Sequence, residues 1–545
     1  MSGLNLQWVL DHPRDALLLA IATVFIAATA TSLLRPKSPI PVLSGTIPRL
    51  SITLLYMTDM ETFYARAKSA LREKNIVQFY LGTTKAYLVT GANNIQAMFR
   101  TSASVNSDVF ILMVQKHIWN ITGDDYAKFA NDKSGRLKVP APGTEDTPEE
   151  RRYWAGMHNI MHRYITRTNE TNVLAKNYQR FFEERLERFP LGKGMEVCVY
   201  DFLLKDMATA VVTAVNGKRI LEMTPDLFDL LWSLDEVAAS LVWGLPRWLN
   251  RDTCNKRDRF HGAVARYLES AFKDFDWDTE GDPEWEPILG CRFIRELLRW
   301  MREKDFSLQA MASALGVLTL FGANANTIPV TAWCVMEIFK DPKLFKAVRE
   351  ELETTYETCP ISGQRTINAQ TLTSLPLLQS IYIEGLRLHV SMNVTREITG
   401  PIELSGGITP EKGTILQAAT EITHYDESIW GRDKHPASEF WAERHVKYVD
   451  DGHGKRVRQF VMAGGPNDFF PYGGGVSICP GRFFAKQEIM LAIAIMVSRF
   501  NVEFLGWVNR DGTPSDRPAL NDVRWSGGAA QPPDRDMKVL LKRVW

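Results

Sequence analysis

The chain has 545 residues, a length that allows several domains or one large one, because no low-complexity linker divides the sequence after residue 45. The 64 Lys and Arg residues balance the 64 Asp and Glu residues, and the resulting formal net charge of zero argues against nucleic acid as a partner. The six cysteines are scattered without pairing or C-x-x-C spacing, which argues against a zinc ribbon and suits a reducing compartment.

An uncharged apolar run covers residues 16–34 and reads ALLLAIATVFIAATATSLL. At about 1.5 Å per residue, this run is just long enough to span a hydrocarbon core of roughly 30 Å. Basic residues follow it directly, whereas acidic residues offset the basic residue before it, so the positive-inside rule places the rest of the chain on the cytoplasmic side. A cleaved signal peptide is the alternative, but the run is long for one. We therefore predict a short N-terminal segment at residues 1–15 and a retained transmembrane anchor at residues 16–34.

Pro36, Pro39 and Pro41 lie within residues 35–50, which we predict to form a stiff, extended hinge that holds the globular part at a set angle to the bilayer. The globular part, residues 51–545, contains two early strand-like segments, VQFYLG at residues 77–82 and AYLVTG at residues 86–91. Their composition predicts two strands of a hairpin-like sheet.

The sequence TPEE at residues 147–150 has the pattern of a capping box with proline at the first helical position. It predicts the start of a helix that carries Trp154 and His158. An ordinary amphipathic helix without a functional role is an equally good interpretation of this segment.

The loop LVWGLPRWL at residues 241–249 has a turn-forming proline between two tryptophans. It fits a packed core loop and, equally well, a loop that dips into a membrane surface, where tryptophan is favoured.

The longest strongly apolar helical stretch covers residues 306–340, and Asn324, Asn326 and Thr327 interrupt it with polar side chains. Buried amides and hydroxyls need partners. Pro329 removes a backbone donor, which should loosen or kink the turn before it. This turn is a candidate ligand site, and the alternative is a threonine that bonds back to a carbonyl of its own helix.

A further helix is predicted at residues 377–390, where Glu384 and Arg387 lie three residues apart on one face and can pair. Such pairs are common on helix surfaces and mean little alone. Arg444, in the later segment FWAERH at residues 440–445, can complete a Glu-Arg-Arg cluster in which arginine acts as a rigid brace with several donors.

The segment FFPYGGGVSICPGRFFA, residues 469–485, places Cys479 between a glycine run and Pro480-Gly481, directly before a long apolar helix. Glycines let a backbone approach a large flat group. Backbone N–H groups near the sulfur and the positive end of the helix dipole favour a thiolate. The alternative is a free core cysteine beside a glycine-rich turn.

The cysteine segment resembles the ligand loop of the cytochrome P450 family, with an aromatic residue, glycine, cysteine and glycine at Tyr472, Gly475, Cys479 and Gly481. The order of the elements along the chain also matches the family: the anchor, the proline hinge, the polar-kinked helix, E-x-x-R and the cysteine loop. The resemblance covers essentially the whole chain. It implies a mainly α fold with small β-sheets, as one large haem-thiolate domain at residues 51–545 behind the N-terminal transmembrane helix.

The resemblance implies a haem b cofactor with Cys479 as the axial ligand of the iron. Glu384, Arg387 and Arg444 would form the structural brace on the same side of the haem. The further residues that the resemblance implies to contact the haem are Arg396, Trp154, His158, Tyr472, Gly473 and Gly481.

On the opposite side, the resemblance assigns Thr327 as the hydroxyl of the oxygen pocket and Asn326 as its catalytic neighbour. The terminal β-turn within residues 527–533 would close the substrate pocket. The pocket residues implied in this way are Phe321, Gly322, Ala323, Ala325, Ala529 and Ala530.

Three positions depart from the family's common pattern. Ser477 replaces the usual basic residue two before the cysteine, so another cation must compensate. Tyr472 replaces a phenylalanine, which is a mild change. Asn326 replaces the usual acid, and an amide orders a water but does not relay a proton by ionising.

The resemblance implies a monooxygenase of the endoplasmic reticulum membrane, single-pass, with a cytosolic catalytic domain and no nucleic-acid partner. It would use dioxygen and NADPH-derived electrons from NADPH-cytochrome P450 reductase, docked near Arg482 and Lys486. Similarity to the branch of cholesterol 7α-hydroxylase, sterol 12α-hydroxylase and prostacyclin synthase implies a lipophilic substrate such as a sterol or terpenoid. Two alternatives remain: a haem-thiolate isomerase or dehydratase without external electrons, which Asn326 favours, and a non-catalytic haem-binding membrane protein.

Overall fold

The computed structural model describes residues 40–47, 49–72, 74–100, 104–277, 283–358 and 365–545. The predicted N-terminal segment, the anchor and the hinge up to residue 39 lie outside the described residues. The end of the hinge runs along the first strand, since the Gln78 N–H donates to the Pro41 carbonyl at 2.8 Å and the Leu43 N–H donates to the Gln78 carbonyl at 2.8 Å.

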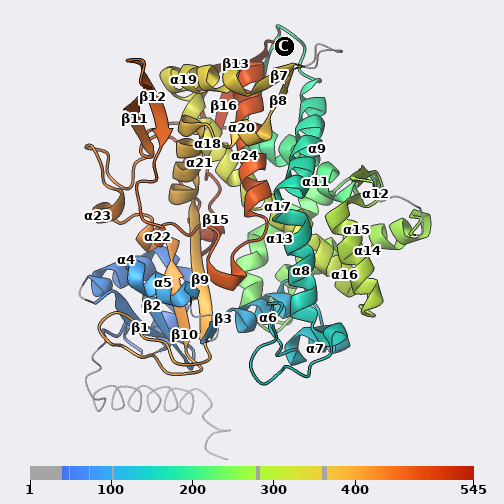
Figure 1. Ribbon diagram of the computed structural model, residues 1–545, viewed down its shortest axis with the longest axis vertical. Helices are drawn as coiled ribbons and strands as arrows, with labels where there is room; N and C mark the ends of the chain where they lie inside the picture. The colour runs from blue at the N-terminus through green and yellow to red at the C-terminus, as the bar shows by residue number, and fades with distance from the viewer. Residues whose placement is uncertain (1–39, 48, 73, 101–103, 278–282, 359–364) are drawn as a thin grey trace, which may run out of the picture.

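The fold is mainly α-helical with small sheets, as the sequence predicted (Figure 1). The predicted early strands are present as an antiparallel pair, β1 and β2. They belong to a six-stranded sheet in the order β1-β2-β10-β9-β15, with β3 paired to β9. Its strands are β1 (Ile76–Leu81), β2 (Thr84–Val89), β3 (Val105–Asn106), β9 (Val390–Ile398), β10 (Ile415–Ala419) and β15 (Gly528–Ala530).

A second sheet has the order β14-β13-β16-β4 and joins the end of the chain to the helical part. Its strands are β4 (Gly194–Cys198), β13 (Phe500–Val508), β14 (Pro514–Ser515) and β16 (Asp536–Arg543). The remaining strands form three hairpins: β5 (Trp285–Glu286) with β6 (Gly290–Cys291), β7 (Tyr356–Thr358) with β8 (Arg365–Ile367), and β11 (Val446–Asp450) with β12 (Arg456–Phe460).

Small helices pack beside the first sheet, and the larger helices form the rest of the molecule (Figure 1). The helices near the first sheet are α3 (Leu50–Thr58), α4 (Met60–Leu71), α5 (Ala92–Arg100) and α22 (Thr420–Thr423). The other α-helices are α6 (Asp108–His117), α7 (Gly123–Asn131), α8 (Tyr153–Ile165), α9 (Thr168–Leu186), α10 (Val199–Phe202), α11 (Ala208–Asn216), α12 (Arg219–Met223), α13 (Leu227–Val242), α14 (Arg251–Asp274), α15 (Arg292–Glu303), α16 (Leu308–Leu315), α17 (Gly322–Asn324), α18 (Thr327–Phe339), α19 (Pro342–Leu352), α20 (Ala369–Leu372), α21 (Pro376–His389), α23 (Glu427–Trp430) and α24 (Arg482–Arg499). Short 3-10 turns are η1 (Glu149–Arg151), η4 (Glu353–Thr355), η5 (Gly475–Ser477) and η6 (Val523–Trp525), and π-helical turns are η2 (Leu203–Met207) and η3 (Gly316–Phe321).

The predicted long apolar helix is the stretch Leu308–Phe339, which we call the central helix. It consists of α16, the π-helical turn η3, α17 and α18. Non-helical turns at residues 325–326 separate α17 from α18, in agreement with the loosening expected before Pro329. In the described part of the chain, it is the one helix long and apolar enough to cross a membrane, but the majority of its apolar window is buried in protein.

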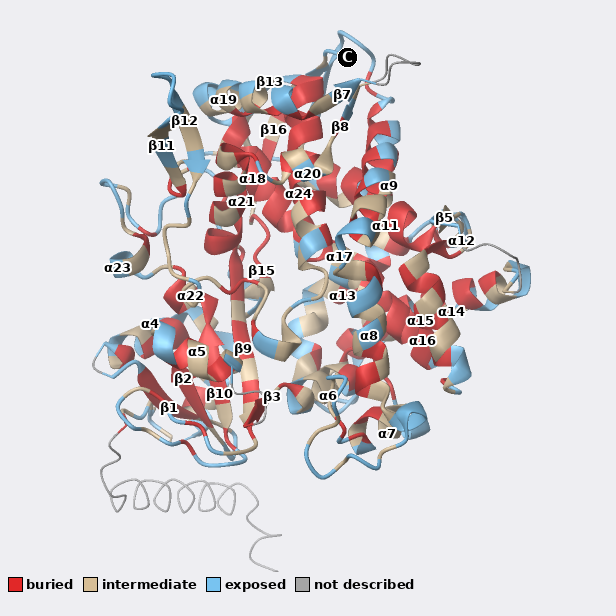
Figure 2. Ribbon diagram, viewed as in Figure 1, coloured by how far each residue is buried: buried red, intermediate tan, exposed pale blue. Residues whose placement is uncertain are grey.

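The middle of the molecule is built from helices that are apolar on nearly all sides. Figure 2 shows buried residues concentrated in α18, α21 and α24. A helix that is apolar all round belongs in a core. In α24, every residue from Gln487 to Arg499 is buried, so this helix gives the loop before it a rigid support.

The predicted helix start at residues 147–150 is not the one observed. Residues 149–151 form the 3-10 turn η1, and α8 begins at Tyr153 without a side-chain cap from its neighbouring residue Arg152. The backbone N–H of Trp154 instead donates to the carboxylate of Asp132 at 3.0 Å. This distant carboxylate satisfies one of the unpaired N–H groups of the first turn, and no local sequence pattern contains it.

Candidate active site

The loop before α24 holds Cys479 in a fixed backbone conformation. The Cys479 N–H donates to the Tyr472 carbonyl at 3.0 Å. Gly473 and Gly475 have φ values of 70° and 67°, in the left-handed region that favours glycine. A Cβ atom on Gly475 would also lie 2.6 Å from the carbonyl oxygen of Phe99 in α5, so this contact requires glycine.

The Cys479 side chain is exposed, whereas Cys254, Cys291 and Cys334 are buried. Nevertheless, burial raises the pKa of the Cys479 thiol, and hydrogen bonds from the backbone N–H groups of Gly481 and Arg482 lower it. The thiol is therefore surrounded by protein but uncovered on one side. Two N–H donors at the start of α24 are in place to stabilise a thiolate.

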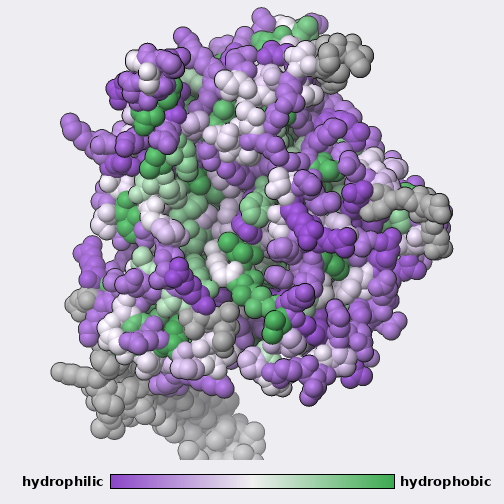
Figure 3. All heavy atoms as spheres, viewed as in Figure 1, coloured by the Kyte–Doolittle hydropathy of each residue, from purple (hydrophilic) through white to green (hydrophobic). Residues whose placement is uncertain are grey.

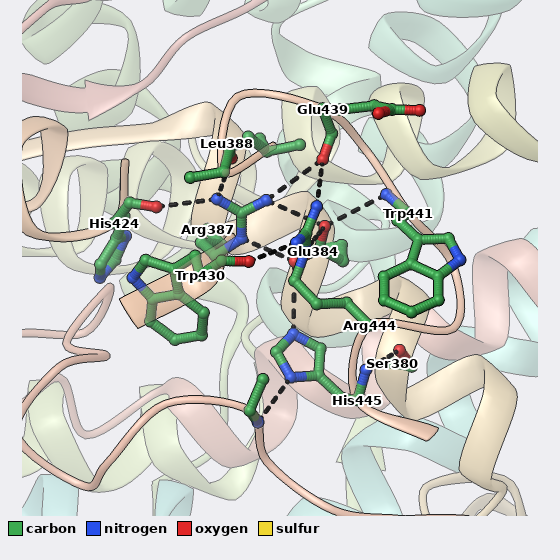
Figure 4. Close-up of polar contacts among 12 residues, drawn as sticks. Ser380, Glu384, Arg387, Leu388, His424, Trp430, Glu439, Trp441, Arg444 and His445 are labelled. Atoms are coloured by element: carbon green, nitrogen blue, oxygen red, sulfur yellow. Dashed lines mark hydrogen bonds and ion pairs between the residues drawn. The ribbon is translucent and has the colours of Figure 1, made fainter. Parts of the chain in front are cut away.

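Three charged residues from distant parts of the sequence meet in the core beside this loop, as Figure 4 shows. The Glu384 carboxylate accepts from Arg387 Nε at 2.6 Å, from Arg387 Nη2 at 2.9 Å and from Arg444 Nε at 2.9 Å. All three side chains are completely buried. The structure thus brings together the predicted cluster of Glu384, Arg387 and Arg444.

A fourth member, His445, was not predicted. Its Nε2 lies 3.3 Å from Glu384 Oε1, and its Nδ1 accepts from the Ala463 N–H at 3.0 Å. Burial alone would raise the pKa of Glu384, but hydrogen bonds from Arg387 and His445 and the two arginine charges outweigh it and lower the pKa to about 2. The carboxylate therefore stays ionised in the core.

His424 connects this cluster to the cysteine loop, and no sequence motif indicates it. Its carbonyl accepts from Arg387 Nη1 at 2.8 Å, and its ring Nε2 accepts from the Phe470 N–H at 3.2 Å. Burial lowers the pKa of His424 to about 3, so the ring is neutral and able to accept. The cluster thereby fixes the start of the loop that carries Cys479.

Several cations converge near the loop. Arg396, on β9, donates from Nη2 to the Gly474 carbonyl at 2.9 Å. Burial, with the nearby charge of Arg136, lowers the pKa of Arg396 to about 10. Burial and the charge of Arg136 also lower the pKa of His158. Arg136 pairs with Asp108, so the cluster of three basic groups has one described carboxylate partner and suits an additional anion.

Arg136 was missed because it lies in an irregular loop with no motif. Its guanidinium lies 4.1 Å from the ring centroid of Trp154. Ser477, which replaces the family's usual basic residue, bonds to the Ser107 hydroxyl at 2.6 Å. Arg136 is therefore a candidate for the compensating cation.

Two predicted cofactor residues have hydrogen-bond partners within the protein. The indole N–H of Trp154 donates to the Phe129 carbonyl at 3.0 Å, so its single donor is already used. The Tyr472 hydroxyl bonds to the Tyr382 hydroxyl at 2.7 Å.

One face of the central helix is covered by protein only in part. We call this face, which carries Phe321, Gly322, Ala323 and Asn326, the bared face. Gly322 and Asn326 are exposed, and Phe321 and Ala323 are half-buried, although most of the surrounding helix is buried. Gly322, the first residue of α17, and Asn326, directly before α18, lie on either side of the turn that separates these two helices. Figure 3 shows hydrophobic side chains gathered along the middle of the molecule. This face suits an apolar ligand.

Two of the predicted pocket residues do not present their side chains there. Ala325 is 3% exposed and Ala530 is 0% exposed, so both methyl groups pack in the core. Ala529 is half-buried. For Ala325 the reason is helical geometry, because a residue adjacent to an exposed position points in a different direction.

The Thr327 hydroxyl has two oxygen partners within the protein. Thr327 is 4% exposed, and its Oγ1 lies 2.7 Å from the Ala323 carbonyl and 2.8 Å from Glu488 Oε1 in α24. The back-bonded threonine considered from sequence is thus the observed one. Burial raises the pKa of Glu488 well above its usual range. The Thr327 hydroxyl is thus placed to donate to either oxygen.

Asn326 is the polar residue on the bared face of the central helix. Its Oδ1 accepts from the Ala530 N–H at 2.9 Å, which joins the central helix to β15.

These residues together fit a haem. The uncovered Cys479 thiol supplies an iron ligand, the cation cluster at Arg136 and Arg396 suits carboxylates, and the bared helix face suits an apolar ring or substrate.

Comparison with known proteins gives consistent matches. The family model for cytochrome P450 matches residues 54–514. Cytochrome P450 monooxygenase calL of Penicillium decumbens is 45% identical over 511 residues, which cover 93% of each chain. Cytochrome P450 7A1 of Sus scrofa is 30% identical over 311 residues, 54% of this chain and 58% of the relative. The structure of retinoic acid bound cyanobacterial CYP120A1 has a TM-score of 0.64 and 18% identity, and the match covers 93% of this chain and 100% of that one.

The first of these relatives is similar along nearly its whole length, and the family model spans most of the chain. The chain therefore belongs to the cytochrome P450 family, whose members hold a haem iron, and it is a P450 monooxygenase.

Proposed function

We propose that the protein is a membrane-anchored haem-thiolate monooxygenase that oxidises a lipophilic substrate with dioxygen and NADPH-derived electrons. The observation that supports this most directly is the uncovered Cys479 thiol at the start of α24, a helix that is buried from Gln487 to Arg499, with two backbone N–H groups directed at the sulfur. When bound, haem b supplies the iron at which dioxygen is activated.

In this proposal Cys479 would supply the thiolate that holds the haem iron. The backbone N–H groups of Gly481 and Arg482 stabilise the negative charge of the thiolate. Arg396, Arg136 and His158 bind the carboxylates of the cofactor, with Arg136 in place of the basic residue that Ser477 lacks.

The buried cluster has a positioning role. Glu384 orients Arg387 and Arg444, and Arg387 acts on the cysteine loop through His424. A loop held in this way keeps the sulfur at one place when substrate binds or leaves.

On the opposite side, the apolar face near Phe321 binds the substrate and excludes water. Asn326, rather than Thr327, presents a polar group there, because the Thr327 hydroxyl is occupied by Ala323 and Glu488. The Asn326 amide can hold a water molecule by hydrogen bonds but does not ionise.

We propose a sterol, a terpenoid or a related natural-product intermediate as the substrate. Supporting relatives are the 12-alpha-hydroxylase of 7-alpha-hydroxycholest-4-en-3-one from Homo sapiens, 27% identical over 271 residues, and the 5-beta-cholestane-3-alpha,7-alpha-diol 12-alpha-hydroxylase of Sus scrofa, 28% identical over 303 residues. Each match spans about half of this chain. The bared apolar face is consistent with a rigid lipophilic ring system.

The membrane proposal rests on residues 16–34 and on two exposed apolar groups in the described structure. In the loop at residues 241–249, Trp248 is 79% exposed and Leu249 is 59% exposed, which favours membrane contact over a packed core loop. In α3, Leu50 and Leu54 are each 49% exposed. We propose that these groups touch the cytosolic surface of the endoplasmic reticulum.

We further propose that NADPH-cytochrome P450 reductase docks near the cysteine loop. Of the two cations expected there, Lys486 donates to Gln379 at 3.0 Å and burial lowers its pKa, which leaves Arg482 as the more accessible charge.

One observation favours a second candidate, a haem-thiolate isomerase or dehydratase that needs no external electrons. The polar residue on the bared face is an amide, Asn326, and the neighbouring hydroxyl of Thr327 is turned away from that face. Turnover of a peroxide or preoxidised substrate without NADPH would identify this activity.

The proposal is tested by comparing lipophilic products from cells that express the natural chain with products from cells that express Cys479→Ala. The natural chain is expected to give oxygenated products that the variant lacks. Identical product profiles would contradict the role of the thiolate.

A further inference from the structure

The contact between Asn326 and β15 joins two elements that lie 204 residues apart in the sequence. Ala530 is paired with Val390 of β9, and the next N–H, that of Gln531, donates to the His389 carbonyl at 2.7 Å. Successive N–H groups of an extended strand point to opposite sides. The Ala530 N–H therefore points away from β9 and toward the central helix, where Asn326 accepts it.

A second contact lies two helical turns further along. Trp333 Nε1 donates to the Gln531 carbonyl at 2.9 Å, and the Trp333 ring stacks on His389 with centroids 4.1 Å apart. Residues 326 and 333 lie on the same side of a helix. The end of β15 is thus attached to the central helix at two consecutive residues, Ala530 and Gln531.

The attached strand borders the bared face. Gly528 is exposed and Ala529 is half-buried, and Asn326, which bonds to the next residue Ala530, is exposed on the central helix. At Gly527, directly before β15, a Cβ atom would lie 3.0 Å from Met60 Cε and 3.1 Å from Tyr64 Oη.

The orientation of the Asn326 amide follows from its partner. Only an acceptor can face the Ala530 N–H, so Oδ1 occupies that position and Nδ2 points elsewhere. An aspartate at position 326 would keep the acceptor and lose the N–H₂ donor. An alanine would lose both groups.

We propose that Asn326 is a positioning residue that fixes β15 against the central helix and thereby determines which carbon of the substrate is oxidised. This inference rests on the proposed function, in which substrate binds along the bared face. Asn326 acts through the backbone of residues 528–530, whose position sets how far the substrate extends over the cofactor.

The first arm of the test measures hydrogen exchange, which does not depend on turnover. Amide exchange in the peptide of residues 526–534 is compared among the haem-bound natural chain, Asn326→Ala and Asn326→Asp. The Ala530 amide is expected to exchange about fivefold faster in Asn326→Ala, as for loss of one hydrogen bond, and at the natural rate in Asn326→Asp. Asn324→Ala is the matched control, since Asn324 bonds to the Leu320 carbonyl of its own helix and has no hydrogen bond to β15 among the described residues.

The second arm measures the ratio of product regioisomers. Asn326→Ala is expected to shift the ratio at least severalfold, whereas Asn326→Asp is expected to keep the natural ratio even where its turnover number changes. Unchanged exchange in Asn326→Ala, faster exchange with an unchanged ratio, or an Asn326→Asp variant that behaves like Asn326→Ala would each overturn the inference.

The failure of the proposed function has a different signature. If the natural chain gives no oxygenated product, the monooxygenase proposal fails, and the positioning role is then decided by binding. A panel of sterols and terpenoids is ranked by the shift of the haem absorption band. An unchanged ranking in Asn326→Ala would contradict the inference, and a changed ranking restored in Asn326→Asp would support it.

Discussion

Glu384 receives hydrogen bonds from Arg387, Arg444 and His445 in a part of the core that water does not reach. A buried carboxylate of this kind is not strong evidence for added stability, because its desolvation offsets much of the attraction. Removing its charge has a clearer effect, since the two arginines would remain buried without a counter-ion.

We therefore predict that Glu384→Gln lowers the free energy of unfolding by about 3–5 kcal/mol, measured by denaturant titration. Glu443→Gln is the control, because Glu443 is partly exposed and lies 3.8 Å from Arg458, and a surface pair contributes at most about 1 kcal/mol. If the two substitutions lowered the free energy of unfolding equally, the structural role of Glu384 as the counter-ion of Arg387 and Arg444 would be contradicted.

The contribution of Glu384 to the stability of the fold depends on pH. The folded-state pKa of Glu384 is about 2, below its usual value of 4.5, so the unfolded chain takes up a proton first as the pH falls. Its contribution to stability is full above pH 4.5 and is lost as the pH falls toward 2. The difference in stability between the natural chain and Glu384→Gln should shrink over this interval.

The proposed role of the cation cluster in haem binding can also be tested with single residues, Arg136 and Ser477. We predict that Arg136→Leu releases haem faster to an excess of an apo haem-binding protein, because one cation near the cofactor carboxylates is lost. Adding Ser477→Arg, which restores the family's usual basic residue, should slow the release again. A release rate that neither substitution changes would exclude this role for Arg136.

At the scale of elements, the central helix and α24 are joined by Thr327 and Glu488. Glu488 is fully buried, and its Oε2 is without a described hydrogen-bond partner. Burial raises the pKa of Glu488 well above its usual range, which favours the protonated carboxyl.

Glutamine keeps the shape of a protonated glutamate and has a donor. We predict that Glu488→Gln changes the free energy of unfolding at pH 8 by less than about 1 kcal/mol, whereas Glu488→Ala is more destabilising because it leaves Thr327 without this partner and opens a cavity. Denaturant titration of both variants gives the comparison. A Glu488→Gln variant as unstable as Glu488→Ala would show that the ionised form is the native one.

The elements also show what sequence could predict. The cysteine loop and the E-x-x-R helix were predictable, because their residues are close in sequence and their spacing is part of the motif. The direction of Thr327 was not, because the π-helical turn at Gly316–Phe321 and the break at residues 325–326 change the phase of the central helix. A regular 3.6-residue period does not describe such a helix.

Long-range partners account for the other differences. The start of α8 depends on Asp132, and the indole of Trp154 is used by the Phe129 carbonyl. His424 and Arg136 act from segments without a motif. In each case a side chain meets a partner that the fold supplies and local pattern does not contain.

At the scale of the whole molecule, the described fold begins on the first sheet at Ile40, which is 7% exposed, and the proposed anchor precedes it. We predict that a chain lacking residues 1–34 folds and binds haem, and that it sediments with phospholipid vesicles less completely than the full chain. Adding Trp248→Ser and Leu249→Ser to the shortened chain should remove the remaining binding. Equal sedimentation of the full and shortened chains would contradict the anchor.

The central claim is that this fold uses dioxygen and external electrons to oxidise a bound lipophile. It is tested most directly by supplying the purified chain with NADPH, reductase, a lipophilic substrate and dioxygen labelled with a heavy oxygen isotope. The expected product carries one labelled oxygen atom and does not form without NADPH or with Cys479→Ala. A product that forms without NADPH and carries no label would contradict it.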